Sequence, residues 1–337
     1  MARDGRVTRA PSEESSPGAS PVRCFPLAGW SDGAHSRHVT LDFEFSMSAG
    51  FLGLALLAFA IGAVVRAVGP VRPPALPRGP GLGGWRIGDG IYLPLDLGVA
   101  AFLIGFYAII PLVLMGATDL GDKEMEIGTA ALVMNAAVQF FLMAMVIGVM
   151  AWRRHPVDWL GLKWRPVPVV LTVLIVLGAG LVATMATGYF VYGLQAVGYQ
   201  DWLLGQLGFQ SQQEAAQDVV KAFSEAEGPG VLAMLCLTAV VVAPVTEEVI
   251  FRGYLYPVAK RFAGRWAAVA FSSLLFAMVH QNAMALLPLA FLAVLLALSY
   301  ELTGSIWAPI GIHMFFNGTT VALQIAQRME WITLPQT

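Results

Sequence analysis

The chain has 337 residues, of which 57% are hydrophobic and only 12% are charged, and its formal net charge is -2. An average soluble domain has about 25% charged residues. This composition therefore excludes an ordinary cytosolic protein, a disordered scaffold and a nucleic-acid binder with a basic face. The chain is interpreted as an integral membrane protein whose first partner is the lipid bilayer.

The first 46 residues differ from the rest of the chain. They are rich in Arg, Ser, Pro and Gly and show no apolar period, which predicts a disordered tail at 1–46 before a membrane domain at 47–337. Met47 stands just before the first apolar run and is therefore an alternative start of translation. A tryptic peptide from residues 1–46 of the native protein would exclude that alternative.

Eight apolar segments are candidates for membrane helices, each of which needs about 20 mainly apolar residues. We therefore expect an all-α polytopic membrane protein with about eight transmembrane helices. The sixth segment is short and the seventh follows almost at once, which predicts a tight helical hairpin. The predicted spans are Ser48–Val68, Ile91–Ala117, Thr129–Trp152, Val167–Leu194, Val231–Tyr256, Trp266–Gln281, Ala283–Leu302 and Ser305–Ala326.

The charges of the loops predict an orientation. The loops after the first, third and fifth spans are basic, whereas those after the second and fourth are acidic. Basic loops stay in the cytoplasm, so both termini are expected outside. Short basic loops and the lack of a eukaryotic sorting tag make a prokaryotic plasma (inner) membrane the expected location.

The fifth predicted span contains three charged residues, Glu247, Glu248 and Arg252. A charge near the bilayer centre costs at least ~2.5–3.5 kcal/mol on insertion scales, so each needs a partner or a function. Glu248 and Arg252 are four residues apart and share a helix face, which predicts an ion pair. Glu247 points about 100° away and has no partner on its own helix. It is therefore the candidate general base.

Two of the five histidines lie in the later predicted spans. His280 follows Phe276 by four residues, and His313 precedes Asn317 by four residues on the same helix face. At 1.5 Å per residue, Glu247, His280 and Asn317 lie ~18–23 Å from the cytoplasmic ends of their helices. These groups are therefore expected to converge on one intramembrane polar cavity.

Such a set of side chains fits amide hydrolysis without a covalent intermediate. A Glu and a His beside one water molecule can deprotonate it, and the protonated Glu can then pass its proton to the leaving amine. A second His and an Asn can donate hydrogen bonds to the oxyanion, and losing one such donor typically costs ~10²–10³ in rate.

At these residues the sequence resembles the CPBP group of CAAX proteases and bacteriocin-processing enzymes, also called the Abi group. The group's three patterns are EExxxR, FxxxH, and HxxxN or HxxxD. They occur in this order in the chain, the first at Glu247, Glu248 and Arg252, the second at Phe276 and His280, and the third at His313 and Asn317. The resemblance covers roughly residues 230–325, which are the expected catalytic core.

The resemblance implies an intramembrane endopeptidase of the glutamate type, similar to type II CAAX prenyl endopeptidases. By this analogy Glu247 activates water, His280 positions it, and His313 with Asn317 stabilises the oxyanion. Glu248 and Arg252 support the site. The implied substrate is a membrane-embedded peptide or a lipidated protein, and no cofactor is expected.

Three alternatives remain open at this point. A zinc ion could be bound by Glu247, His280 and His313, although the His-Glu-x-x-His pattern of metalloproteases is absent and Asn317 is a poor zinc ligand. A proton-coupled transporter could use Glu247, His280 and Arg252 as a relay. An inactive scaffold or immunity protein could keep the fold without the reaction.

Overall fold

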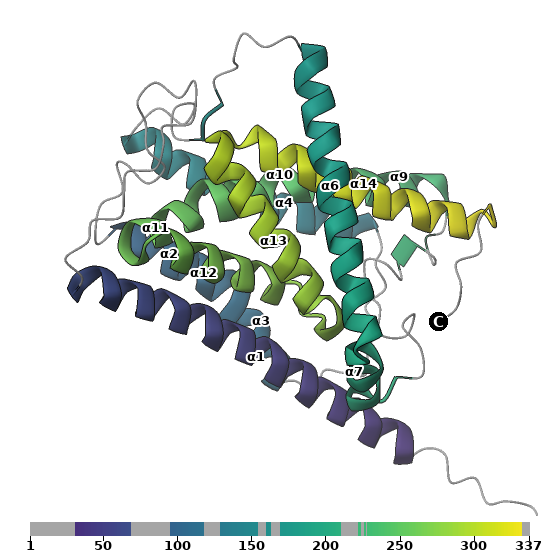
Figure 1. Ribbon diagram of the computed structural model, residues 1–337. Coiled ribbons are helices and arrows are strands. Elements are labelled where there is room, and N and C mark those ends of the chain that lie inside the picture. Colours follow the sequence, from purple (N-terminus) through teal and green to yellow (C-terminus); the bar gives the residue numbers. More distant parts are fainter. Residues whose placement is uncertain are drawn as a thin grey trace, which may run out of the picture.

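The computed structural model describes residues 31–68, 95–117, 129–153, 160–162, 169–209, 222–223, 226 and 228–331. Within these ranges every long element is a helix, as the composition predicts (Figure 1). Three short stretches inside the long helices are π-helical and are labelled η. The first two long helices are α1 (Ser31–Val68) and the continuous helix α2 (Leu95–Ile104), η1 (Gly105–Ile109) and α3 (Ile110–Ala117).

The remaining helices follow in chain order. They are α4 (Thr129–Arg153), α6 (Val169–Ala196) and the short α7 (Tyr199–Leu207). One continuous helix then contains α9 (Pro229–Leu237), η2 (Thr238–Val242), α10 (Ala243–Ile250), η3 (Phe251–Leu255) and α11 (Tyr256–Ala263). The chain ends with α12 (Arg265–Met278), α13 (Ala283–Thr303) and α14 (Trp307–Arg328).

A helix stands at each of the eight predicted spans, but not all of them have the length and composition of a membrane span. Within the described residues six do: Phe43–Val68, Leu95–Val113, Leu132–Trp152, Val170–Ala196, Pro229–Ala263 and Ala283–Thr303. Helix α12 has only 14 residues, and α14, with 22 residues, carries His313, Asn317 and further polar side chains. The chain is thus a multi-pass membrane protein with six clear candidate spans.

Helix α1 begins earlier than the sequence predicts. It includes residues 31–46, which overlap the segment expected to be a disordered tail, while residues 1–30 lie outside the described part. Near its start Phe43 packs with Leu203 and Leu207 of α7, and its ring lies 6.2 Å from that of Trp202. The alternative start at Met47 stays a prediction, and it would remove these contacts of Phe43.

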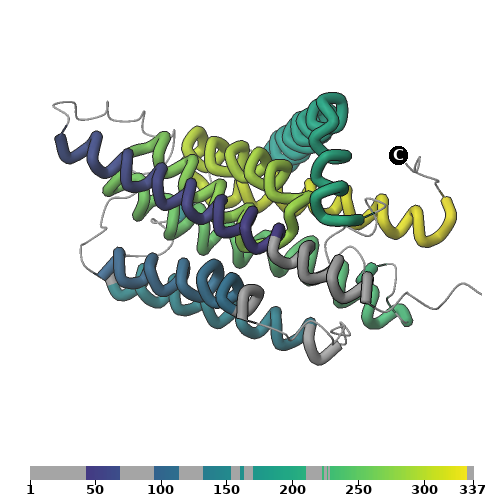
Figure 2. Tube along the Cα trace, turned by 90° about the horizontal axis from the view of Figure 1, so that it is seen from below, coloured from purple at the N-terminus to yellow at the C-terminus, as the bar shows by residue number. Residues whose placement is uncertain are grey.

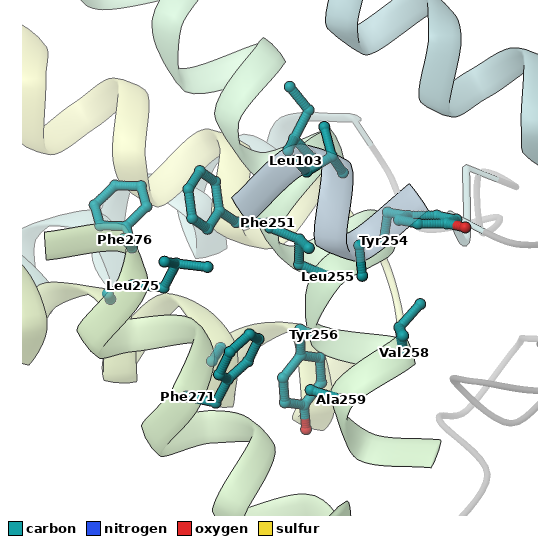
Figure 3. Close-up of a cluster of buried hydrophobic side chains, with 14 of the residues drawn as sticks. Leu103, Phe251, Tyr254, Leu255, Tyr256, Val258, Ala259, Phe271, Leu275 and Phe276 are labelled. Carbon is teal, nitrogen blue, oxygen red and sulfur yellow. The ribbon is translucent and has the colours of Figure 1, made fainter. Parts of the chain in front are cut away.

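The core of the fold lies between α1, α10–α11, α12 and α13. Helix α12 packs between α1 on one side and α13 on the other, and α1 runs along α11 and α12 (Figures 1 and 2). Buried aromatic and aliphatic side chains of η3, α11 and α12 meet in the main hydrophobic cluster (Figure 3). This cluster fixes the position of the helix that carries Glu247, Glu248 and Arg252.

Gly62 allows α1 to approach the α11–α12 turn. A Cβ atom at this position would lie 2.3 Å from Ala267 Cβ and 2.4 Å from the backbone oxygen of Ala263. We expect Gly62→Ala to lower the free energy of unfolding by about 1–3 kcal/mol, because overpacking pushes the helices apart. Thermal unfolding in detergent micelles measures this change. The control is Gly53→Ala on the same helix, where nothing lies within 4 Å and the change should be neutral or stabilising. Equal loss in both variants would contradict the prediction.

Candidate active site

The helix of residues 229–263 contains two π-helical turns, and each ends directly before a proline. In η2 the N–H of Ala243 bonds to the oxygen of Thr238, and Pro244 follows. In η3 the N–H of Tyr256 bonds to the oxygen of Phe251, and Pro257 follows. Proline has no N–H, so it cannot continue this bonding pattern. π-turns of this kind occur frequently at functional sites. Glu247 and Glu248 lie in α10 between the two turns, and Arg252 lies in η3.

The first π-turn explains the position of Asn317. In the pattern of η2 the next donor to Ala239 O would be the nitrogen of Pro244, which carries no hydrogen. Asn317 Nδ2 on α14 donates to this oxygen instead, at 2.9 Å. The amide of Asn317 therefore joins α14 to η2, one turn from His313 on the same helix.

Glu248 and Arg252 form the ion pair that their spacing predicts. Arg252 Nη1 donates to Glu248 Oε1 at 2.9 Å, and both side chains are fully buried. Arg252 Nη2 donates to the backbone oxygen of Ala293 on α13 at 3.1 Å, and its guanidinium lies 4.5 Å from the centre of the Phe276 ring. The pair thus connects α10, η3, α12 and α13.

His313 lies between the two glutamates. Its Nδ1 is 2.9 Å from Glu248 Oε1, and its Nε2 is 4.0 Å from Glu247 Oε2. The Glu248 carboxylate, paired with Arg252, only accepts hydrogen bonds, so Nδ1 carries a hydrogen and Nε2 faces Glu247. Glu247 Oε2 is buried and accepts no hydrogen bond from the described residues.

Phe276 links the three motifs. Its ring centre lies 5.2 Å from that of Phe251 in η3 (Figure 3), 4.9 Å from that of His280 and 5.7 Å from that of His313. His280 Nδ1 also hydrogen-bonds the backbone oxygen of Phe276 at 2.8 Å. The Phe of FxxxH therefore holds both histidines against the helix that carries the glutamates.

The predicted site residues are brought together only in part. Glu247 and His313 face each other directly, and Glu248 and Arg252 stand behind His313. In the part of the chain that the structure describes, no hydrogen bond joins His280 or Asn317 to Glu247. Their side chains bond to Phe276 O and to Ala239 O instead.

Three further polar side chains beside the site were not identified in the sequence analysis. Thr246, directly before Glu247, donates from Oγ1 to Gln139 Oε1 on α4 at 2.7 Å and is fully buried. Gln139 Nε2 in turn donates to Asn135 Oδ1 at 3.3 Å. The sequence contained a signal for two of them, because Asn135 and Gln139 are four residues apart in an apolar span and share a helix face.

The residues of the alternative zinc site are separate in this arrangement, and each histidine is bonded at Nδ1. Among the described residues no three His, Cys, Asp or Glu side chains lie close enough to hold one metal ion. His313 Nδ1 is engaged by Glu248, and His280 Nδ1 by a backbone oxygen. In both histidines Nε2 stays available, and a bond from Nδ1 to a carboxylate or a backbone oxygen is also common in zinc ligands, so zinc remains an alternative.

Comparison with known proteins identifies the C-terminal part of the chain. Residues 229–319 match the family model described as type II CAAX prenyl endopeptidase Rce1-like. No curated protein and no solved structure has a significant match. The matched segment contains the whole arrangement of Glu247, Glu248, Arg252, Phe276, His280, His313 and Asn317. Residues 229–319 are thus similar to the Rce1-like family, which is a family of proteases, in line with the resemblance of this segment to the CPBP group.

Proposed function

We propose that this protein is an intramembrane endopeptidase that uses Glu247 to activate water and cleaves a membrane-embedded or lipidated peptide. The observation that carries the proposal is the placement of His313 between two carboxylates, one of which is paired with an arginine while the other is not. Glu248 is neutralised by Arg252 and orients the ring, whereas Glu247 faces Nε2 at 4.0 Å with a buried oxygen that accepts no bond from the described residues.

The spacing of these two groups suits one water molecule. In the neutral form of His313 that we propose for the reaction, Nε2 and Glu247 Oε2 are both acceptors, so they repel each other unless a donor stands between them. A water molecule at about 2.8 Å from each can donate one hydrogen to each across a separation of 4.0 Å. In this proposal Glu247 takes the proton of the water and His313 holds the water, which differs from the role in stabilising the oxyanion that the resemblance implies for His313.

The reaction that follows is hydrolysis of a peptide bond. Water loses a proton to Glu247, and the hydroxide adds to the carbonyl carbon to form a tetrahedral oxyanion. The C–N bond then breaks as the protonated Glu247 returns the proton to the leaving nitrogen. Asn317 Nδ2 has a second hydrogen beyond the one given to Ala239 O, and it is the proposed oxyanion donor. The His280 ring contacts the Phe276 ring, with 4.9 Å between the ring centres, and His280 is proposed to help position the water.

The proposal also covers the arrangement of the protein in the membrane. With α12 and α14 the six clear candidate spans become eight membrane-embedded helices around a polar cavity at Glu247. The basic loops predict a prokaryotic plasma membrane with the loop after α4 in the cytoplasm. A CAAX-type protease acts on a lipidated chain end, which suits a site reached from within a bilayer.

The test is cleavage by the purified full chain in liposomes. A farnesylated peptide ending in Cys-a-a-X, followed by mass spectrometry, should be cut once, and activity should persist after treatment with a strong chelator. Persistence is expected because the residues at the site do not form a three-ligand set. Loss on chelation with recovery on adding zinc would overturn the metal-free mechanism. Glu247-dependent proton flux without any cleavage would favour a transporter, and neither activity would favour a scaffold.

A further inference from the structure

One face of α4 packs against the helix that carries Glu247, and the burial of the side chains on this face changes along α4. Residues on this face recur at spacings of three and four, as on one side of a helix. They are Leu132, Asn135, Gln139, Leu142, Val146 and Met150. The last three are at most 1% exposed, and Leu132 at the other end is 5% exposed. Asn135 is exposed although it lies between these buried positions. The packed face of α4 therefore has an exposed polar side chain at Asn135.

The polar side chains along this face form a chain of hydrogen bonds. Thr246 Oγ1 also bonds to the oxygens of Val242 and Ala243 on its own helix, and it lies 2.7 Å from Gln139 Oε1. Since Gln139 Oε1 faces Thr246, its Nε2 donates to Asn135 Oδ1. Asn135 consequently turns its Nδ2 outward. Within the ranges that the structure describes, no acceptor is bonded to this nitrogen.

Asn135 thus presents the two N–H groups of Nδ2 one helical turn from the contact of Gln139 with Thr246. Gln139 lies beside Thr246, which precedes Glu247, and Asn135 is one helical turn away, about 6 Å along α4. An extended peptide advances about 3.3 Å per residue, so this turn corresponds to about two residues of a bound substrate. The backbone of a peptide bound within a membrane needs partners for its carbonyl groups, and outward N–H groups supply one.

We propose that Asn135 is a substrate-binding residue that donates from Nδ2 to a main-chain carbonyl of the peptide, about two residues from the cleaved bond. Gln139 is a positioning residue that holds Asn135 in this orientation through Thr246. The inference rests on the proposed protease function. It identifies α4, which lies outside residues 229–319, as part of the substrate-binding site.

The first arm of the test compares two variants in the liposome assay with the farnesylated Cys-a-a-X peptide. Asn135→Leu should raise KM about five- to tenfold, as expected for one lost hydrogen bond, with kcat changed less than threefold. The matched control is Met134→Leu, the neighbouring residue, which is 65% exposed on another face of the helix, and it should leave both constants unchanged.

The second arm uses peptides in which one uncut peptide bond is replaced by a trans-alkene, which removes the carbonyl while keeping its planar shape. One such peptide should be cut about five- to tenfold less efficiently by the wild type, with no further loss in Asn135→Leu. A purely structural Asn135 would give equal losses in both proteins.

The outcomes separate the two proposals. If wild type cleaves, Glu247→Gln does not, and Asn135→Leu behaves like Met134→Leu, the protease function stands and the role of Asn135 is overturned. Equal losses with every alkene peptide in both proteins overturn it as well. If wild type cleaves none of the peptides, the proposed function fails and this inference fails with it.

Discussion

Glu247→Gln is expected to reduce peptide cleavage by about 10²–10⁴-fold, the usual contribution of a general base, while the fold persists. Glutamine has nearly the size of glutamate, but its amide takes up no proton from water. Glu247 Oε2 accepts no hydrogen bond from the described residues, so the replacement removes no structural contact at that atom. Initial rates in liposomes, together with thermal unfolding in detergent, measure both effects.

The matched control is Glu248→Gln, which makes the same chemical change one residue later. Glu248 Oε1 is bonded by Arg252 and by His313, and its side chain is fully buried. Its replacement leaves the buried Arg252 without a counter-charge, so this variant should lose stability as well as activity. If Glu247→Gln kept turnover within threefold of the wild type, Glu247 would not be the base.

Arg252→Met should lower the free energy of unfolding by about 3–5 kcal/mol, because it leaves a buried carboxylate without its cation. Both partners have no exposed surface, and Arg252 also bonds the backbone oxygen of Ala293 and lies over the Phe276 ring. Titration of the micelle-bound protein with a denaturing detergent, followed by tryptophan fluorescence, measures the change.

A double variant separates the cost of the unpaired charge from the loss of packing. Glu248→Gln combined with Arg252→Met leaves no buried charge in the pair and should recover part of the stability that Arg252→Met alone removes. Arg261→Met, at an exposed arginine in the last turn of α11, is the control and should be neutral. A double variant less stable than either single variant would contradict this account of the pair.

These two predictions differ because the adjacent glutamates have different surroundings. Glu248 is engaged by Arg252 and His313, and its contacts extend to α13 and α14. Glu247 faces His313 Nε2 at 4.0 Å, and its Oε2 accepts no hydrogen bond from the residues that the structure describes. The helix places adjacent residues about 100° apart, so one carboxylate can support the packing of the helices while the other remains available for chemistry.

Several features of this protein could be predicted from local sequence alone. Apolar runs of about 20 residues predict helices, because in lipid the backbone must satisfy its own hydrogen bonds. A helix is present at each predicted position. The Glu248–Arg252 pair follows from a spacing of four, and the structure contains it. Pro244 and Pro257 could also have indicated the irregular turns that precede them.

Other features depend on contacts between distant segments. His313 meets Glu248 across 65 residues, Asn317 meets Ala239 O across 78, and Thr246 meets Gln139 across 107. Hydrophobic periodicity shows which face of a helix is polar, but it does not show which other helix that face will contact. The sequence therefore determined the helices, the local ion pair and the residues available for chemistry. Only the tertiary packing decided that His313 faces Glu247, that Asn317 bonds to a π-turn, and that α4 lies beside the site.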